Sequence, residues 1–284
     1  MGLIANPEKV TGRNLVRKAA GLVTQSGREV LTEPATARLA RLEPPQCADT
    51  RALASRCDLL VVFGGDGTIL GVAREIAGIP TPILCINLGG LGFLTTSSSA
   101  RLAHTLEQAW GGHCLLEARS LIEAVGLGRA QQPPEIALND FVISRGSVPR
   151  LIELEVKVDG DVLTCYRGDG LIVSSPTGST AYSLAAGGAV VSPEAHVFAL
   201  TPICAHTLSS RSVIVSLSST VEVRLLSERV ETLLAADSQT RFRLAAGDIV
   251  AFRQSAHAVH LVRLPGASFF DTLRQKLNWS GSSV

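Results

Sequence analysis

Hydrophobic and polar positions before about Leu115 follow two alternating periods. Short apolar runs predict β-strands at residues 2–6, 28–32, 58–63 and 82–88. Between them, helical spacing of the apolar positions predicts helices at residues 11–26, 68–77 and 97–110. The run 58–63 is continuously apolar, as expected of a strand covered on both faces of a parallel sheet. The pattern therefore predicts an α/β domain made of successive β–α–β units.

After Leu115 the pattern changes to many strands separated by turns, which predicts a second, β-rich domain. Within it, the dipeptide Asp159-Gly160 between two strand-like segments predicts a β-hairpin. Helical spacing returns at residues 269–277, and we expect this helix to pack on the first domain. The chain then divides into an α/β domain, residues 1–117 completed by residues 266–284, and a β-rich domain, residues 118–265.

The composition describes a well-packed globular protein, with 46% hydrophobic and 18% charged residues and a mean hydropathy of +0.28. Its net charge of +1 argues against a nucleic-acid-binding protein. We expect a soluble cytoplasmic protein, because no apolar run approaches the roughly 20 residues of a membrane span and no signal peptide is recognisable. The six cysteines form no C-x-x-C pair, and His257 and His260 lack a third ligand nearby, so we expect neither disulfides nor a zinc site.

The turn Gly64-Gly65-Asp66-Gly67-Thr68 lies between a predicted strand and a predicted helix, where α/β proteins collect ligands. Glycines let backbone N–H groups approach phosphate oxygens, so we expect Gly64, Gly65 and Thr68 to bind phosphates. Asp66 would repel phosphate unless it binds a metal or accepts a proton from an attacking hydroxyl. Capping of the following helix is its structural alternative. The turn lacks the lysine of a P-loop, and the chain has no G-x-G-x-x-G fingerprint.

Two further segments suit a nucleoside. Residues 169–182 crowd hydroxyl-bearing and small side chains beside Tyr182, which offers hydrogen bonds and one aromatic face. Asn139 and Asp140 can grip adjacent ribose hydroxyls, because a carboxylate accepts two hydrogen bonds and an amide both donates and accepts. Taken singly, each segment is equally well explained as an ordinary turn.

Together these segments resemble the NAD kinase family, and the resemblance covers nearly the whole chain. The segments that carry it are Gly64–Thr68, Asn87–Leu94, Asn139–Asp140, Asp169–Tyr182, Thr201–Arg211, Ala236–Gln239 and Leu277–Ser280. The resemblance implies the NAD kinase/diacylglycerol kinase-like fold, with an α/β N-terminal domain, a β-sandwich-like C-terminal domain and the active site between them. It also implies phosphorylation of the 2′-hydroxyl of the adenosine ribose of NAD, which gives NADP.

The resemblance assigns roles to single residues. Asp66 would accept the proton of the ribose 2′-hydroxyl, and Gly67 beside it would hold the nucleotide. Asn139 and Asp140 would bind the ribose and the adenine side. The other positions that match nucleotide contacts of the family are Phe93, Arg150, Arg167, Asp169, Thr177, Thr180, Ala181, Tyr182, Ala185 and Gln239. An arginine beside a hairpin is as often a solvated charge, and Phe93 could equally fill the core; we expect His206 to be structural.

The sequence departs from the family pattern at two positions. Asp140 stands where the family often carries glutamate, and its side chain is one methylene shorter, which puts its reach in doubt. Ala185 stands where many relatives carry serine, so one hydroxyl contact to the nucleotide is missing.

The resemblance further implies ATP or polyphosphate as the phosphoryl donor and a divalent cation, Mg²⁺, held mainly by the donor's phosphates. It suggests a homodimer or homotetramer with no nucleic-acid or membrane partner. Two alternatives stay open: a lipid or sugar kinase, since diacylglycerol kinases and phosphofructokinases share the G-G-D-G-type turn, and a non-catalytic NAD-binding module. The hydroxyl-rich residues 177–182 argue against the first, and Asp66 argues against the second.

Overall fold

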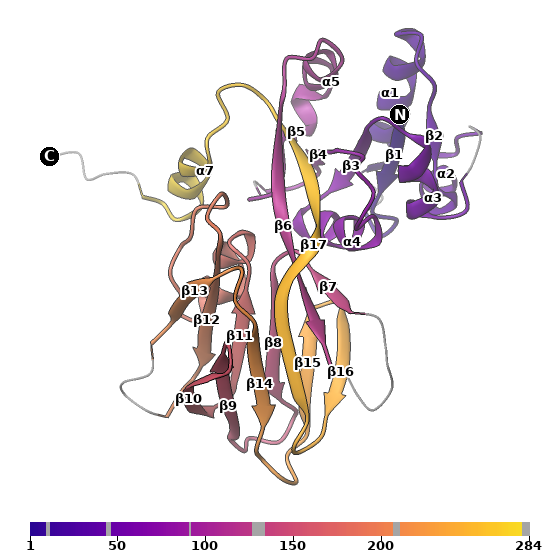
Figure 1. Ribbon diagram of the computed structural model, residues 1–284. Coiled ribbons are helices and arrows are strands. Elements are labelled where there is room, and N and C mark those ends of the chain that lie inside the picture. Colours follow the sequence, from indigo (N-terminus) through magenta and orange to yellow (C-terminus); the bar gives the residue numbers. More distant parts are fainter. Residues whose placement is uncertain (10–11, 44–46, 91, 127–133, 207–210, 280–284) are drawn as a thin grey trace, which may run out of the picture. The chain divides into compact units, whose positions relative to one another are not determined.

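The computed structural model describes the chain except for residues 10–11, 44–46, 91, 127–133, 207–210 and 280–284 (Figure 1). Parts of three segments that carry the family resemblance, Leu91, residues 207–210 and Ser280, thus lie outside the described residues. The chain forms two compact units: unit 1 is Met1–Ala118 with Val259–Val284, and unit 2 is Arg119–Ala258. The boundaries expected from the sequence are at residues 117/118 and 265/266.

Unit 1 is built on parallel strands in the order β2-β1-β3-β4, with the end of β17 beside β4. The strands are β1 (Gly2–Ala5), β2 (Leu31–Thr32), β3 (Leu60–Gly64), β4 (Ile83–Asn87) and the short β5 (Ser97–Ser98). Every residue of β1, β3 and β4 is buried, as their apolar runs predict. The register pairs Gly64 with Asn87, so the segments that follow β3 and β4 start side by side.

Helices of unit 1 bury apolar side chains against this sheet, and the core includes Val16, Phe63 and Leu84. The helices of unit 1 are α1 (Gly12–Gln25), α2 (Pro34–Ala40), α3 (Thr50–Arg56), α4 (Asp66–Glu75), α5 (Leu102–Trp110), which follows the 3₁₀ turn η1 (Ser99–Arg101), and α7 (Phe269–Lys276). None of the described helices is long and apolar enough to cross a bilayer.

Several sequence predictions in unit 1 are wrong in detail. The helix expected from residue 68 begins two residues earlier, at Asp66, and the helix expected from residue 97 begins at Leu102, because residues 97–98 pair with β4. Helices α2 and α3 escaped prediction because their apolar pattern is short. Their starts are fixed instead by side-chain caps, Glu33 for α2 and Asp49 for α3.

Unit 2 is a β-sandwich, which confirms the predicted fold class. One sheet is antiparallel, in the order β13-β12-β11-β8-β15-β16, and the other contains β10-β9-β14-β17, with β6 paired to β17 and β7 paired to β6. A single core takes side chains from both sheets, including Phe141 and Phe252, whose ring centroids are 5.3 Å apart. The hairpin predicted at Asp159-Gly160 is present between β9 and β10, and both residues have a positive φ.

The bounds of these elements are β6 (Leu115–Val125), β7 (Glu135–Ala137), β8 (Asp140–Arg145), β9 (Ile152–Val158), β10 (Asp161–Gly168), β11 (Gly170–Ser174), η2 (Thr177–Thr180), α6 (Tyr182–Ala185), β12 (Val197–Ile203), β13 (Val213–Ser216), β14 (Val221–Leu225), β15 (Thr232–Ala236), β16 (Thr240–Leu244) and β17 (Ile249–Arg263).

Candidate active site

Asp66 lies where the chain turns from β3 into α4. Gly65 is the N-cap residue and Asp66 is the first residue of the helix, so the side chain of Asp66 does not cap it. One carboxylate oxygen accepts the backbone N–H of Phe93 at 2.9 Å, and the other accepts that of Leu94 at 3.2 Å. The carboxylate remains half-buried. Two main-chain amides therefore fix the orientation of a carboxylate that solvent and ligand can still reach.

Two glycines make this arrangement sterically possible. A Cβ atom on Gly92 would lie 2.1 Å from Oδ1 of Asp66, and a Cβ atom on Gly64 would lie 2.3 Å from Oγ1 of Thr68. Both separations are far shorter than a van der Waals contact. Neither position can carry a side chain without moving the residue that faces it. The sequence predicts that Gly64 binds phosphate; its observed local task is to make room for Thr68.

Asn87, the last residue of β4, shapes the segment that leads to Gly92. Its Oδ1 atom accepts the N–H of Gly89 at 2.8 Å, and its Nδ2 atom donates to the carbonyl of Gly90. Further on, Gly92 donates its N–H to Oγ1 of Thr95 at 3.2 Å. These contacts hold the segment in the turn that presents the amides of residues 93 and 94 to Asp66.

Alanine in place of Gly92 is expected to displace the Asp66 carboxylate and lower kcat by roughly tenfold to a hundredfold, since small misplacements of a catalytic group have effects of that size. Steady-state kinetics of the phosphoryl transfer that the family resemblance implies would measure the decrease. Gly90→Ala is the matched control, because a Cβ atom there meets nothing within 4 Å. Equal activity of Gly92→Ala and Gly90→Ala would contradict the prediction.

Phe93 packs against α7. Its ring centroid is 6.4 Å from that of Phe269, and Nζ of Lys276 lies 5.7 Å from the Phe93 ring centroid. The side chain is half-buried, so it fills part of the hydrophobic contact with α7. The residue whose N–H binds Asp66 is thus held from its other side by the C-terminal helix.

A second group of candidate residues surrounds the buried carboxylate of Asp237 in unit 2. This carboxylate accepts three consecutive backbone N–H groups, from Leu138 at 2.9 Å, Asn139 at 2.8 Å and Asp140 at 3.2 Å. In return, the N–H of Asp237 donates to the carbonyl of Asp140 at 2.9 Å. Asp237 therefore fixes the conformation of the Asn139–Asp140 pair.

The hydroxyl-rich segment after β11 packs directly on the same pair. Ser175 donates its N–H to the carbonyl of Asn139 at 2.8 Å and its hydroxyl to the carbonyl of Leu138 at 2.5 Å. A Cβ atom on Gly178 would lie 2.1 Å from the Asn139 carbonyl oxygen, so only glycine fits there. The structure thus brings together Asn139–Asp140 and the start of residues 177–182, which the sequence singled out separately.

Asp140 is buried, and its environment disfavours its charge. Burial raises the pKa of Asp140 to about 7, and the negative charge of Asp237 adds to the rise. The folded chain therefore holds this proton in the pH range where the unfolded chain, with a pKa near 3.8, has released it. This stabilisation is complete below the unfolded pKa and is lost as pH rises towards 7.

Asp140→Asn is accordingly expected to remove part of the decline in stability that the wild type shows with rising pH. From about pH 5 to about pH 8, the free energy of unfolding of the variant should rise relative to that of the wild type by on the order of a few kcal/mol. Urea unfolding at both pH values would measure it. Asp159→Asn is the control, and its stability relative to the wild type should change with pH in the opposite direction. The reason is that backbone N–H donation from Thr220 lowers the pKa of Asp159. Parallel pH curves for Asp140→Asn and the wild type would contradict the prediction.

Asp169 lies at the other end of the β8–β11 ladder. It forms an ion pair with Arg145 at 2.6 Å, and this hydrogen-bonded partner lowers the pKa of Asp169. The register pairs Gly170 with Ser144 but Ser174 with Asp140. At about 3.3 Å per residue, Asp169 is therefore roughly 16 Å along the strand from the Asn139–Asp140 end.

Helix α6 lies on the outer face of the sheet between these two groups. The hydroxyls of Ser183 and Thr201 are 2.9 Å apart, and Ala186 packs on Val142, Ile172 and Ile203. The candidate residues of this segment range from buried Thr177 to exposed Tyr182 and Ala185. These candidate residues therefore differ widely in how accessible they are to a ligand.

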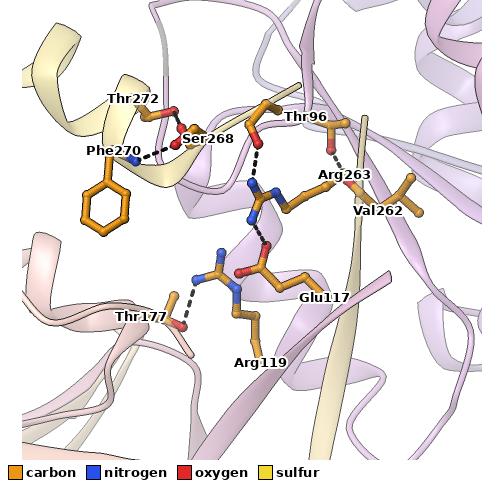
Figure 2. Close-up of polar contacts among 10 residues, drawn as sticks. Thr96, Glu117, Arg119, Thr177, Val262, Arg263, Ser268, Phe270 and Thr272 are labelled. Atoms are coloured by element: carbon orange, nitrogen blue, oxygen red, sulfur yellow. Dashed lines mark hydrogen bonds and ion pairs between the residues drawn. The ribbon is translucent and has the colours of Figure 1, made fainter. Parts of the chain in front are cut away.

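Arg119 contacts the start of the hydroxyl-rich segment, residues 177–182. Figure 2 shows its guanidinium directed at Thr177, and Nη1 donates to Oγ1 of Thr177 at 3.3 Å. Arg119 is only 7% exposed, so a buried cation stands behind the start of the hydroxyl-rich turn. No pattern in the sequence distinguished this residue.

A polar network in unit 1 fixes the segment before α7. Arg263 forms an ion pair with Glu117 at 3.0 Å and also donates to the carbonyl of Ala267, while Ser268 caps the helix through the N–H of Phe270 (Figure 2). These contacts determine where α7 starts, and α7 in turn carries the contact to Phe93.

Comparison with known proteins places this geometry in a family. The model of the ATP-NAD kinase N-terminal domain matches residues 1–114, and that of the ATP-NAD kinase C-terminal domain matches residues 138–264. The chain belongs to the NAD kinase family. Membership makes the chain a kinase, and it confirms the family that the sequence segments resemble.

Individual relatives and structures agree with this assignment. An NAD kinase of Symbiobacterium thermophilum is 41% identical over 97% of this chain and 98% of its own length, and one of Syntrophotalea carbinolica is 38% identical over 93% of each. The crystal structure of yeast NADH kinase complexed with NADH aligns with a TM-score of 0.90 at 26% identity, over 99% of this chain and 88% of that one. An NAD kinase of Archaeoglobus fulgidus in complex with ATP shares the fold, with a TM-score of 0.79 at 23% identity over 99% of both chains.

The family resemblance implies a divalent cation held mainly by the phosphates of the donor, and no residue of the chain is assigned as its ligand. Among the residues that the structure describes, no three His, Cys, Asp or Glu side chains gather into a metal-binding group. Asp66 is a single carboxylate whose oxygens already accept two amides. Mg²⁺ commonly needs only one or two carboxylates beside substrate phosphates and water.

Other predicted residues of this family member are more exposed. Arg167 pairs with Glu153 at 3.5 Å with 64% of its side chain exposed, and Arg150 and Gln239 are also exposed. The residues that sequence reasoning missed are Gly92, Asp237, Arg145 and Arg119. Gly92 and Asp237 lie inside segments that carry the family resemblance, so the signal for them was present but no chemical role was attached to it.

Proposed function

We propose that this chain phosphorylates the 2′-hydroxyl of the adenosine ribose of NAD, with ATP as the phosphoryl donor, to form NADP. The observation that carries the proposal is the Asp66 carboxylate, set on a glycine turn after β3 and oriented by two main-chain amides. A carboxylate at a phosphate-binding turn suits a group that accepts the proton of an attacking alcohol. The names of the relatives support the same reaction.

In the proposed step the ribose 2′-oxygen attacks the γ-phosphorus of ATP. The new P–O bond forms as the bond from the γ-phosphorus to the β–γ bridging oxygen breaks, the hydroxyl proton passes to Asp66, and ADP leaves. A divalent cation on the donor's phosphates would neutralise their charge. The chain's own contribution is to orient the alcohol, to hold the proton at Asp66 and to bind the phosphates at Gly64, Gly65 and Thr68.

Unit 2 supplies the proposed nucleotide contacts. Asn139 and Asp140 bind ribose hydroxyls, in a conformation fixed by Asp237. Contacts further along the ligand come from η2 and α6 and from the group around Asp169. The residues proposed for these contacts are Thr177, Thr180, Ala181, Tyr182, Ala185, Gln239, Asp169, Arg150 and Arg167, and in unit 1 Gly67 and Phe93.

We extend the proposal to a homodimer or homotetramer that works in the cytoplasm with Mg²⁺, as the family resemblance implies. Light scattering on the purified protein would measure the assembly. Activity abolished by a chelator and restored by Mg²⁺ would support the cation.

One crossed assay tests the function. Purified protein would be offered NAD, NADH, diacylglycerol or fructose 6-phosphate, each with ATP or with inorganic polyphosphate. NADP formed from NAD and ATP is the expected product. Phosphorylation of the lipid or the sugar instead would favour the related kinases, and NAD binding without any product would favour a non-catalytic module. The NADH arm decides acceptor specificity, since the yeast neighbour is an NADH kinase.

A further inference from the structure

Lys9 brings a positive charge to the glycine turn. Its Nζ atom lies 3.7 Å from the position that a Cβ atom of Gly65 would occupy. Among the described residues, no carboxylate forms an ion pair with Lys9, although the residue next to it is Glu8. Both oxygens of the nearby Asp66 are turned to the amides of residues 93 and 94. An ammonium group therefore faces the open side of the turn with its charge uncompensated.

The backbone around Lys9 is fixed by its own hydrogen bonds. Asn6 donates its N–H to the carbonyl of Phe63 at 3.2 Å, which ties the segment after β1 to the end of β3. Oδ1 of Asn6 accepts the N–H of Glu8 at 2.9 Å, and the carbonyl of Asn6 accepts the N–H of Lys9 at 3.1 Å. These bonds hold the backbone of Lys9 beside the turn, from where its exposed side chain reaches Gly65.

A groove is lined by residues that follow Lys9 in α1 and by residues beyond β4. It has a volume of about 310 Å³ and is lined by Asn14, Leu15, Lys18, Leu88 and Ser99. Leu88 connects it to the glycine turn, since its N–H donates to the carbonyl of Gly64 at 3.2 Å. Gly12 connects it to Lys9: the N–H of Gly12 donates to the Lys9 carbonyl at 2.9 Å, and a Cβ atom on Gly12 would lie 3.0 Å from Leu88.

The charge of this region suits a polyphosphate. Helix α1 carries Arg13, Arg17 and Lys18 in its first half and has no acidic residue along its length. The groove itself combines two leucines with polar side chains at its rim, which suits the base and sugar of a nucleoside. Anionic phosphates at Lys9 and a nucleoside in the groove would together account for the whole donor.

We propose that Lys9 binds the phosphate chain of the nucleoside triphosphate donor over Gly65, and that the donor's nucleoside occupies the groove between α1 and Leu88. This inference rests on the proposed kinase function and names the donor site within it. Lys9 thereby touches the substrate that is cleaved, and it stabilises the negative charge of the phosphates before and during transfer. The acceptor NAD does not contact Lys9.

The test compares wild type, Lys9→Met, Lys9→Arg and the control Arg38→Met, an exposed arginine on α2. With NAD saturating and ATP varied, Lys9→Met is expected to raise the KM for ATP about 10- to 100-fold, the range for removal of a charge-assisted contact. The KM for NAD should change by less than about twofold, and Lys9→Arg should retain most of the ATP affinity. An unchanged KM for ATP in Lys9→Met, or an equal rise in the KM for NAD, would overturn the role of Lys9.

A second variant tests the groove. Ser99→Trp would fill it from an exposed position, so it should weaken ATP but leave inhibition by inorganic triphosphate, which has no nucleoside, at the wild-type level. Equal effects on both ligands would overturn the groove assignment. Lys9→Met should weaken both.

Direct binding keeps the two proposals distinguishable. Calorimetry of ATP binding to the wild type and to Lys9→Met, without NAD, measures the affinity of the donor site independently of phosphoryl transfer. A chain that binds ATP through Lys9 but makes no NADP would contradict the proposed function and support the donor site. If the wild type forms NADP but Lys9→Met binds ATP as tightly as the wild type does, the donor site is contradicted and the proposed function is supported. A wild type that neither binds ATP nor forms NADP would overturn both proposals.

Discussion

Replacing Asp66 with asparagine is expected to lower kcat for NADP formation by roughly 10²- to 10⁴-fold, the range for removal of a general base. Asparagine has nearly the same shape and one carbonyl oxygen, so it can still accept one of the amides of residues 93 and 94. It cannot take up the proton of the ribose hydroxyl. The KM for NAD should therefore stay within about threefold, because the base acts on the hydroxyl proton mainly in the transition state.

Steady-state kinetics and thermal unfolding would be measured together on the Asp66→Asn variant. Asp58→Asn is the matched control, since Asp58 is an exposed carboxylate just before the opposite end of β3. It should keep wild-type kcat. If Asp66→Asn kept more than about a tenth of wild-type kcat, Asp66 would not be the base, because general bases contribute more than that.

Alanine at position 237 is expected to lower the free energy of unfolding by about 2–5 kcal/mol, because each buried polar group left without a partner costs about 1–3 kcal/mol. The Asp237 carboxylate accepts the N–H groups of Leu138, Asn139 and Asp140, of which Leu138 and Asp140 are buried. Removal of the carboxylate also frees the Asn139–Asp140 pair. The variant should bind NAD more weakly even where it is folded.

Asp159→Ala provides the control for Asp237→Ala. Both aspartates lie in unit 2 with a positive φ, 52° for Asp159 and 48° for Asp237, so both substitutions impose a similar backbone strain. Asp159 differs in being exposed and in accepting the N–H of Thr220 at 2.8 Å in a hairpin. Urea unfolding and NAD calorimetry would compare them. Equal destabilisation by the two variants would show that backbone strain, and not the buried amides, accounts for the effect.

Much of the fold could be predicted because buried strands are recognisable as apolar runs and tight turns as characteristic dipeptides. The continuous apolar run at 58–63 predicts β3, and the Asp159-Gly160 dipeptide predicts its hairpin, since each depends only on neighbouring residues. The short α2 and α3 depend on single caps at Glu33 and Asp49 rather than on a long pattern. The predicted start of α4 is wrong because the glycines of the turn mask a helix that already includes Asp66 and Gly67.

The candidate site could be predicted residue by residue but not as a geometry. The sequence indicates that Asp66 has a chemical task, and that Asn139 and Asp140 suit a ribose. It could not indicate that Gly92 gives Asp66 its space, because that contact joins residues from the ends of two different strands. Nor could it separate Asp169 from Asp140, since only the antiparallel register places them at opposite ends of β11.

Asp66 and Asp237 share one feature: each carboxylate accepts hydrogen bonds from consecutive main-chain N–H groups, two for Asp66 and three for Asp237. An amide is supplied by every residue type but proline. A substitution other than proline at positions 93, 94, 138, 139 or 140 therefore leaves in place the main-chain donor that holds the acid, whatever it does to contacts made by the side chain. A survey of homologues should accordingly find both acids retained and proline excluded from those five positions.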